Sequence, residues 1–279
     1  MRRLMLLCCA AMATALLAAT VAESALAAEG NPFFGVEGAA LTGTEAVEAS
    51  ATSNQVLKGT GLTIECKKVA ANAGSQLLTE GLNEETLKYT ECAVPGKAAC
   101  EVRSVKGSEK APVGTIETEA LKSRLEWLTK AAAEEENVSA TGTLFEPATG
   151  EAGLFVELEL AGCGLLNGKH KVSGEVLVEN EASAAEAEAH TLTAPTTALK
   201  HYWRNEGGSA KEKTVHTFEV TPFGTSVYSG TSSVKLSSKR VWKPARCHLV
   251  PFGVGANKYL SRIECLKNEG PEQGEWEYS

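Results

Sequence analysis

Short runs of alternating apolar and polar residues recur along most of the chain from residue 56 onward. The run 61–67 places Leu62, Ile64 and Cys66 on one face, and the run 155–160 alternates in the same way. Alternation with a period of two indicates a strand with one buried face. Many short strands separated by Gly- and Pro-rich turns are typical of sandwiches and barrels. The sequence therefore predicts a mainly β protein, an antiparallel β-sandwich or open barrel held by disulfides.

The stretch 118–136 fits two interpretations. Leu121 and Leu125 keep the spacing of a helix face, and the Ala- and Glu-rich end of the stretch has high helix propensity. The residues from Leu121 to Trp127 also alternate as a strand does. We favour a strand up to Thr129 followed by a helical turn, which would be the one short helix outside the export signal. A helix over the full stretch is the alternative.

Residues 1–27 have the pattern of an export signal. Arg2 and Arg3 precede an apolar run that extends to Ala22, and residues 25–27 form a small-x-small cleavage site. We expect a secreted or cell-envelope-associated protein without a membrane span after cleavage.

The mature chain divides by composition into a short and a long part. Residues 28–55 are small and polar, and we expect a lead-in segment that is partly extended or mobile. Residues 56–279 carry the strand patterns and form the predicted β-rich domain. The Ala- and Glu-rich stretch 181–189 is either a long loop or a seam between two halves of that domain.

The charge excludes some partners. Removing Arg2, Arg3 and Glu23 with the signal changes the formal charge from 27 − 35 = −8 to 25 − 34 = −9. An acidic chain without a basic stripe argues against nucleic acid and against anionic membranes. All 35 acidic residues are Glu. Because Asp is the usual first ligand of Ca²⁺ loops and the usual partner of a catalytic His, we expect no metal and no cofactor.

Six cysteines follow the signal: Cys66, Cys92, Cys100, Cys163, Cys247 and Cys265. An even number in an exported chain, without C-x-x-C spacing, favours disulfides over a metal site. Proximity along the chain suggests the pairs Cys92–Cys100 and Cys247–Cys265. Cys66–Cys163 is the pair that remains, although six cysteines can be connected in many other ways.

Several strand motifs stand in a fixed order with these cysteines: GLTIEC at 61–66, YTEC at 89–92, GTIETEALK at 114–122, FEPA at 145–148 and VSGEV at 172–176. In this layout, over roughly residues 56–240, the chain resembles a group of uncharacterised exported proteins from high-GC Gram-positive bacteria. The resemblance implies an exported, β-rich, disulfide-bearing domain. It implies no activity and no site residue, because we know of none assigned to the group.

Two sets of residues are candidates for chemistry or binding. Glu157 and Glu159 share a strand face about 7 Å apart, the separation that an inverting glycoside hydrolase needs. We favour the other interpretation of this pair, a solvated outer face. Tyr202, Trp203 and Trp242 stand beside cationic residues and are candidate binding residues for a glycan or a protein. The alternative for the two tryptophans is a place in the core or at a sheet edge.

The leading hypothesis is a non-enzymatic extracellular or envelope-associated protein that binds an extracellular protein or glycan, or has a structural role. A Glu-based carbohydrate-active enzyme is the alternative. The sequence contains no complete catalytic constellation that would decide for an enzyme.

Overall fold

The computed structural model describes residues 31–41, 43–134, 140–148, 153–181, 186–253 and 259–265. In these residues the fold is mainly β, with one short α-helix and two disulfides, which confirms the predicted fold class. The elements are β1 Pro32–Val36, β2 Ala39–Ala40, β3 Glu45–Ala51, β4 Gln55–Gly59, β5 Leu62–Ala71, β6 Gln76–Leu77, η1 Thr79–Gly81, β7 Leu82–Glu85, β8 Leu87–Ala93, β9 Glu101–Lys106, β10 Glu109–Lys110, β11 Thr115–Glu117, β12 Leu121–Trp127, α3 Lys130–Glu134, β13 Thr141–Pro147, β14 Leu154–Ala161, η2 Gly164–Leu166, β15 Gly168–Ser173, β16 Val176–Asn180, β17 Ala189–Ala194, β18 His201–Glu206, β19 Ser209–Thr214, β20 Glu219–Val220, β21 Gly224–Leu236, β22 Trp242–Gly253 and β23 Tyr259–Cys265.

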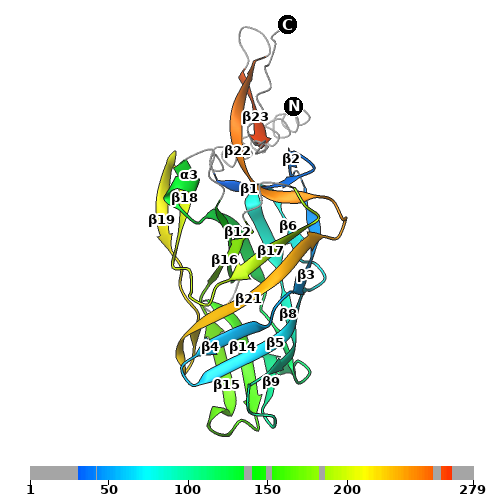
Figure 1. The fold of residues 1–279 in the computed structure, drawn as a ribbon, viewed down its shortest axis with the longest axis vertical. Helices are drawn as coiled ribbons and strands as arrows, with labels where there is room; N and C mark the ends of the chain where they lie inside the picture. The colour runs from blue at the N-terminus through cyan, green and yellow to red at the C-terminus, as the bar shows by residue number, and fades with distance from the viewer. Residues whose placement is uncertain are drawn as a thin grey trace, which may run out of the picture.

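The hydrogen-bonded strands close on themselves twice (Figure 1). One ring, here called the upper ring, runs β3–β6–β7–β12–β13–β16–β17–β21 and returns to β3. The other, the lower ring, runs β4–β5–β8–β11–β9–β14–β15–β20–β21 and returns to β4. Closure leaves few unpaired strand edges, which limits edge-to-edge aggregation.

Strand β21 belongs to both rings. Its first half pairs with β20 and β4 in the lower ring, and its second half pairs with β17 and β3 in the upper ring. The pairing partners of β21 change at Gly230, whose φ is +148°. A Cβ there would lie 2.6 Å from Oε1 of Gln55 and 2.9 Å from the carbonyl oxygen of Asn54. Glycine therefore permits this close approach, which a larger residue would block.

The rings share one core. Inward residues of the lower ring are almost fully buried, among them Ile64, Val102 and Leu158. The same cluster continues into the upper ring through Leu121 and Phe145. The two rings are therefore halves of one folded body. The stretch 181–189, considered above as a seam, connects β16 to β17, which are neighbours in the upper ring; its residues 182–185 lie outside the described part.

The described residues of the segment 28–55 are largely extended, one of the two conformations expected for it, and they pair with the rest of the fold. Strand β1 pairs along β22, and β3 closes the upper ring between β21 and β6. Phe34 of β1 is buried with Leu125, Leu236 and Trp242, so β1 and β22 cover one end of the upper ring. The sequence did not predict these pairings, because small residues give little alternation of apolar and polar positions.

The contested stretch 118–136 contains strand β12 followed by the short helix α3, which confirms the favoured interpretation. Strand pairing decides the conformation: β12 lies between β7 and β13 in the upper ring. Ala132 and Ala133 of α3 pack against the buried Trp127. Tertiary pairing thus outweighs the helical spacing of the leucines.

Both described disulfides join residues that strand pairing brings together. Cys66 stands directly opposite Cys92 in the ladder of β5 and β8, with Cα atoms 3.9 Å apart. Cys100 and Cys163 flank the ladder of β9 and β14, with Cα atoms 4.4 Å apart. The predicted pairs Cys92–Cys100 and Cys66–Cys163 are therefore wrong, because register, and not distance along the chain, decides which cysteines meet.

The third predicted pair concerns β22 and β23. Their register places Cys247 and Cys265 opposite one another. The side chains of these two residues lie outside the described part, so the disulfide Cys247–Cys265 stays a prediction.

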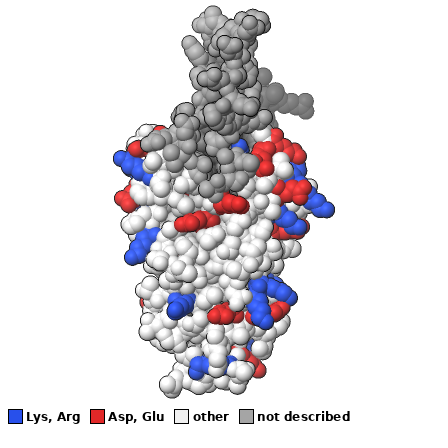
Figure 2. Space-filling model, viewed as in Figure 1, with Lys and Arg blue, Asp and Glu red and all other residues white. Residues whose placement is uncertain are grey.

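The outer surface is charged but mixed in sign. Figure 2 shows basic and acidic side chains close together on the face in view. Several pairs bridge neighbouring strands, such as Lys88–Glu117 at 2.8 Å and Lys235–Glu48 at 3.0 Å. Exposed pairs of this kind contribute little stability each, about 0–1 kcal/mol. Within the described residues, no helix has the length and apolarity needed to cross a membrane.

Candidate functional site

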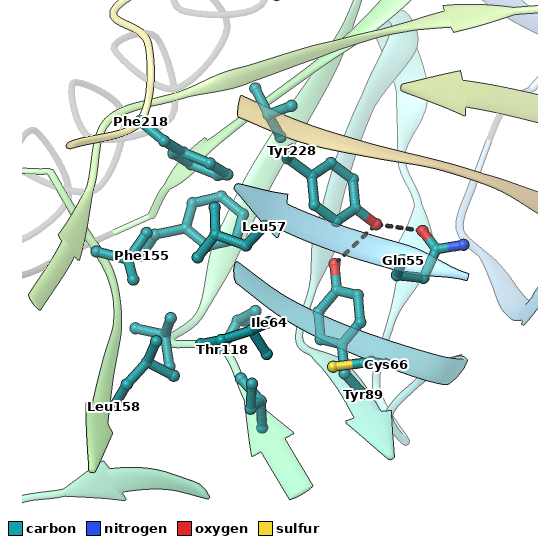
Figure 3. A pocket seen from close by; sticks show the side chains of 14 residues that line it. Gln55, Leu57, Ile64, Cys66, Tyr89, Thr118, Phe155, Leu158, Phe218 and Tyr228 are labelled. Atoms are coloured by element: carbon teal, nitrogen blue, oxygen red, sulfur yellow. Dashed lines mark hydrogen bonds between the residues drawn. The ribbon is translucent and has the colours of Figure 1, made fainter. Parts of the chain in front are cut away.

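The lower ring holds an apolar cavity of about 60 Å³ (Figure 3). One water molecule needs about 10–15 Å³ measured in this way, so the space is several times larger. Strands β4, β5 and β14 supply Leu57, Ile64, Phe155 and Leu158 to the apolar wall, and Phe218, just before β20, also lines it. Leu57, Ile64 and Leu158 are inward positions of alternating strands, whereas Phe155 is brought to the cavity where the register of β14 shifts.

A chain of hydrogen bonds forms the polar end of the cavity. The hydroxyl of Tyr89 donates to the hydroxyl of Tyr228 over 3.4 Å, and Tyr228 donates to Oε1 of Gln55. Nε2 of Gln55 donates to the carbonyl oxygens of Ser53 and Thr231, each at 2.9 Å. Gln55 itself is only 2% exposed. Figure 3 shows the two phenol groups and the amide meeting at one side of the cavity.

The cavity disfavours negative charge. None of the described residues that line it carries a charged side chain. Burial raises the pKa of Tyr228 to about 12 and raises the pKa of Tyr89 well above its usual value. The carboxyl of Glu85 adds to the shift at Tyr89. Both phenols are therefore neutral at physiological pH and act only as hydrogen-bonding groups.

Glu85 lies in the upper ring, close enough to Tyr89 to affect its titration. Burial raises the pKa of the Glu85 carboxyl to about 7, and the hydroxyl of Ser123, which donates a hydrogen bond of 2.8 Å to it, opposes the shift. Asn83 in turn donates to Ser123 over 2.8 Å. Glu85, Ser123 and Asn83 thus form a hydrogen-bonded polar group on the paired strands β7 and β12.

A second, smaller space of about 10 Å³ adjoins the cavity. Val176, Phe218 and Tyr228 line both spaces, so these three side chains form the wall between them. This smaller space lies under the loop 195–199, which is partly exposed. Val176 and Tyr228 of this wall are half-buried, and Phe218 is buried.

The predicted binding residues do not form a common surface. Trp242 is 3% exposed and packs edge-on against Phe34 and His190, with ring centroids 5.8 and 4.5 Å apart. Tyr202 is buried in a separate cluster with Leu144 and Leu177. Trp203 is half-buried beside Trp127. The structure places the three aromatic residues in three different hydrophobic clusters.

Glu157 and Glu159 lie on the outer face of β14. Glu159 pairs with Arg103 at 2.9 Å and with Lys110 at 2.7 Å, while Glu157 lies 3.7 Å from Lys169. The hydrogen bond from Lys110 lowers the pKa of Glu159. A glycosidase acid needs a raised pKa, so this pair has the character of a solvated, ion-paired strand face.

Sequence reasoning missed a buried ion pair between Glu126 and Arg204. Glu126 is 1% exposed, and burial raises its pKa while the hydrogen bonds from Arg204 oppose that shift. The pair attaches β18 to β12 on the outside of the upper ring. Its position away from both cavities indicates a structural role.

Sequence reasoning also missed the cavity. Tyr89 and Tyr228 are recognisable as inward strand positions, but they are far apart in the chain, and nothing in the local pattern shows that their hydroxyls meet. The described residues contain no cluster of three or more His, Cys, Asp or Glu side chains placed to hold a metal ion.

Comparison with known proteins does not assign the cavity. No family model matches the chain, and no curated protein or solved structure shows significant similarity to it. A function for this fold therefore has to be argued from its own geometry.

Proposed function

We propose that this protein is an exported, non-enzymatic binding protein whose ligand is a small, largely apolar molecule held in the cavity of the lower ring. The observation that carries the proposal is the apolar space of about 60 Å³ inside a closed β structure. Small-molecule sites are typically concave, mostly apolar and fitted with a few polar groups that fix orientation. The chain Tyr89–Tyr228–Gln55 is such a set of polar groups.

Two further features support the proposal. The export signal pattern at residues 1–27 and the two disulfides fit a protein that works outside the cytoplasm. The cavity wall offers neutral hydroxyl and amide groups without a general base or a metal cluster among the described residues. A glycan platform has less support, because Trp242 and Tyr202 are buried and stand apart from Trp203.

Calorimetric unfolding of the oxidised mature protein in the presence of benzene tests this proposal. A ligand that binds only the folded state raises the melting temperature progressively with its concentration. Val176→Phe places a ring at the cavity wall and is expected to abolish the rise. Val113→Phe is the matched control, since Val113 is 51% exposed and is not among the residues that line the cavity. A melting temperature that does not respond to benzene, or an equal response in both variants, would contradict the proposal.

A further inference from the structure

We infer that the ligand is an uncharged apolar molecule with one hydroxyl group, and that this hydroxyl is bound by the phenol oxygens of Tyr89 and Tyr228. The inference rests on the proposed function and specifies its ligand class. It depends on the direction of the hydrogen bonds at the polar end of the cavity.

Gln55 fixes that direction. Both hydrogens of its amide nitrogen are directed to backbone carbonyls, those of Ser53 and Thr231. Its oxygen is therefore the group that faces Tyr228 and can only accept. Tyr228 must donate to it, which leaves the lone pairs of the Tyr228 oxygen as acceptors. Tyr89 is then the donor to Tyr228.

The last bond of the chain is weak. The two phenol oxygens are 3.4 Å apart, whereas hydroxyl–hydroxyl hydrogen bonds are usually about 2.7–2.8 Å long. The hydrogen of Tyr89 and one acceptor position of Tyr228 are thus available to a better-placed partner. A ligand hydroxyl can satisfy both, because it accepts from Tyr89 and donates to Tyr228. A carbonyl oxygen can use only the first of these bonds, and a hydrocarbon neither.

Charged ligands do not fit the same site. A carboxylate moved from water into an apolar space needs a cation or several donors, and the described lining supplies no cation and, at this end, only the weakly bound donor of Tyr89. Burial already disfavours the anionic forms of both tyrosines, and Glu85 is close to Tyr89. The site therefore selects against carboxylates as well as for hydroxyls.

The remaining surroundings agree with one ring or a short alkyl chain as the apolar part. The rings of Phe155 and Phe218 meet edge to face, with centroids 4.7 Å apart, and border the cavity. The hydroxyl of Thr118 accepts the backbone N–H of Leu87 and keeps its own hydrogen, so it can offer a ligand a donor. The tyrosine end differs in offering a weakly bound donor and an acceptor next to each other, the pair that a ligand hydroxyl can use.

Titration calorimetry at pH 7 with benzene, phenol and benzoate tests the inference, because the three probes share a ring and differ in the polar group. We expect phenol to bind about tenfold more tightly than benzene, and benzoate not to bind at the same concentrations. Tyr228→Phe and Tyr89→Phe each remove one hydroxyl and are expected to reduce the preference for phenol while benzene affinity is kept. Tyr202→Phe, the same change in another buried cluster, is the control and is expected to keep the preference.

The outcomes separate the two proposals. Benzene binding without a preference for phenol, benzoate binding as tight as that of phenol, or a preference that survives both tyrosine substitutions would overturn the inference and leave the apolar cavity as a binding site. Failure of both benzene and phenol to bind would overturn the proposed function together with the inference.

Discussion

The side chain of Gln55 accepts the hydroxyl hydrogen of Tyr228 at the place where β21 passes from the lower ring to the upper ring. Gln55 also donates to the carbonyl of Thr231, one residue beyond Gly230 on the upper half of β21. One buried amide therefore connects the crossing of the two rings to the polar end of the cavity. Changes at the crossing are expected to alter ligand binding as well as stability.

Gly230→Ala tests this connection. A Cβ at this position would lie 2.6 Å from Oε1 of Gln55, and the backbone has a φ that favours glycine. We expect a loss of about 2–4 kcal/mol in unfolding free energy, together with weaker discrimination between phenol and benzene. Gly43→Ala is the control, since a Cβ there has open space around it and glycine is not required. Urea unfolding measures both variants; equal stability of the two would refute the close contact at Gly230.

The second prediction concerns which cysteines are joined in the two disulfides. Digestion of the non-reduced protein should yield peptides that join Cys66 to Cys92 and Cys100 to Cys163. The closed loops span sequence separations of 26 and 63 residues and do not overlap. Replacing either pair by serine is expected to cost about 3–4 kcal/mol, slightly more for the longer loop. Peptides joining Cys92 to Cys100 would contradict the register of β5 and β8.

Glu85 makes stability depend on pH. Burial raises the folded-state pKa of Glu85 from 4.5 to about 7. The buried carboxylate therefore destabilises the folded state above about pH 7, and this destabilisation is absent below about pH 4.5, where the carboxyl is protonated in both states. Glu85→Gln removes that destabilisation and is expected to stabilise the protein at pH 8 by about 2 kcal/mol, with little effect at pH 4. The exposed neighbour Glu84 provides the control Glu84→Gln. The idea fails if the stability difference between Glu85→Gln and wild type is the same at both pH values.

Trp242 and Trp203 provide a test of core against surface roles. Trp242 is 3% exposed and covers the end of the upper ring with Phe34, whereas Trp203 is half-buried. We expect Trp242→Ala to lower the unfolding free energy by about 3–5 kcal/mol and Trp203→Ala to cost clearly less. Chemical unfolding followed by far-UV circular dichroism distinguishes them. A fully stable Trp242→Ala protein would show that this tryptophan is not part of the core.

The parts of the fold that local pattern determines could be predicted from the sequence. The alternation in β14 gives its buried Leu158 and its outward Glu159, and the stretch 118–136 contains the expected strand and short helix. Both rest on side-chain periodicity within one element, which is visible without knowing the partner strand.

What could not be predicted depends on long-range register. Cys66 meets Cys92 because β5 and β8 pair in one particular alignment, and chain proximity pointed to Cys100 instead. Tyr89 and Tyr228 meet across 139 positions in the chain. The small residues of β3 gave no strong pattern although β3 closes the upper ring. The resemblance to exported proteins of high-GC Gram-positive bacteria stays a prediction and suggests no ligand.

The central claim is that the lower ring contains an apolar space that small molecules can occupy, and a crystal of the oxidised protein pressurised with xenon tests it most directly. Xenon enters dry apolar cavities of proteins. The account predicts a xenon atom in contact with Phe155, Leu158 and Phe218, away from the tyrosine hydroxyls. A cavity that takes up no xenon, because the side chains close it or ordered water fills it, would contradict the claim.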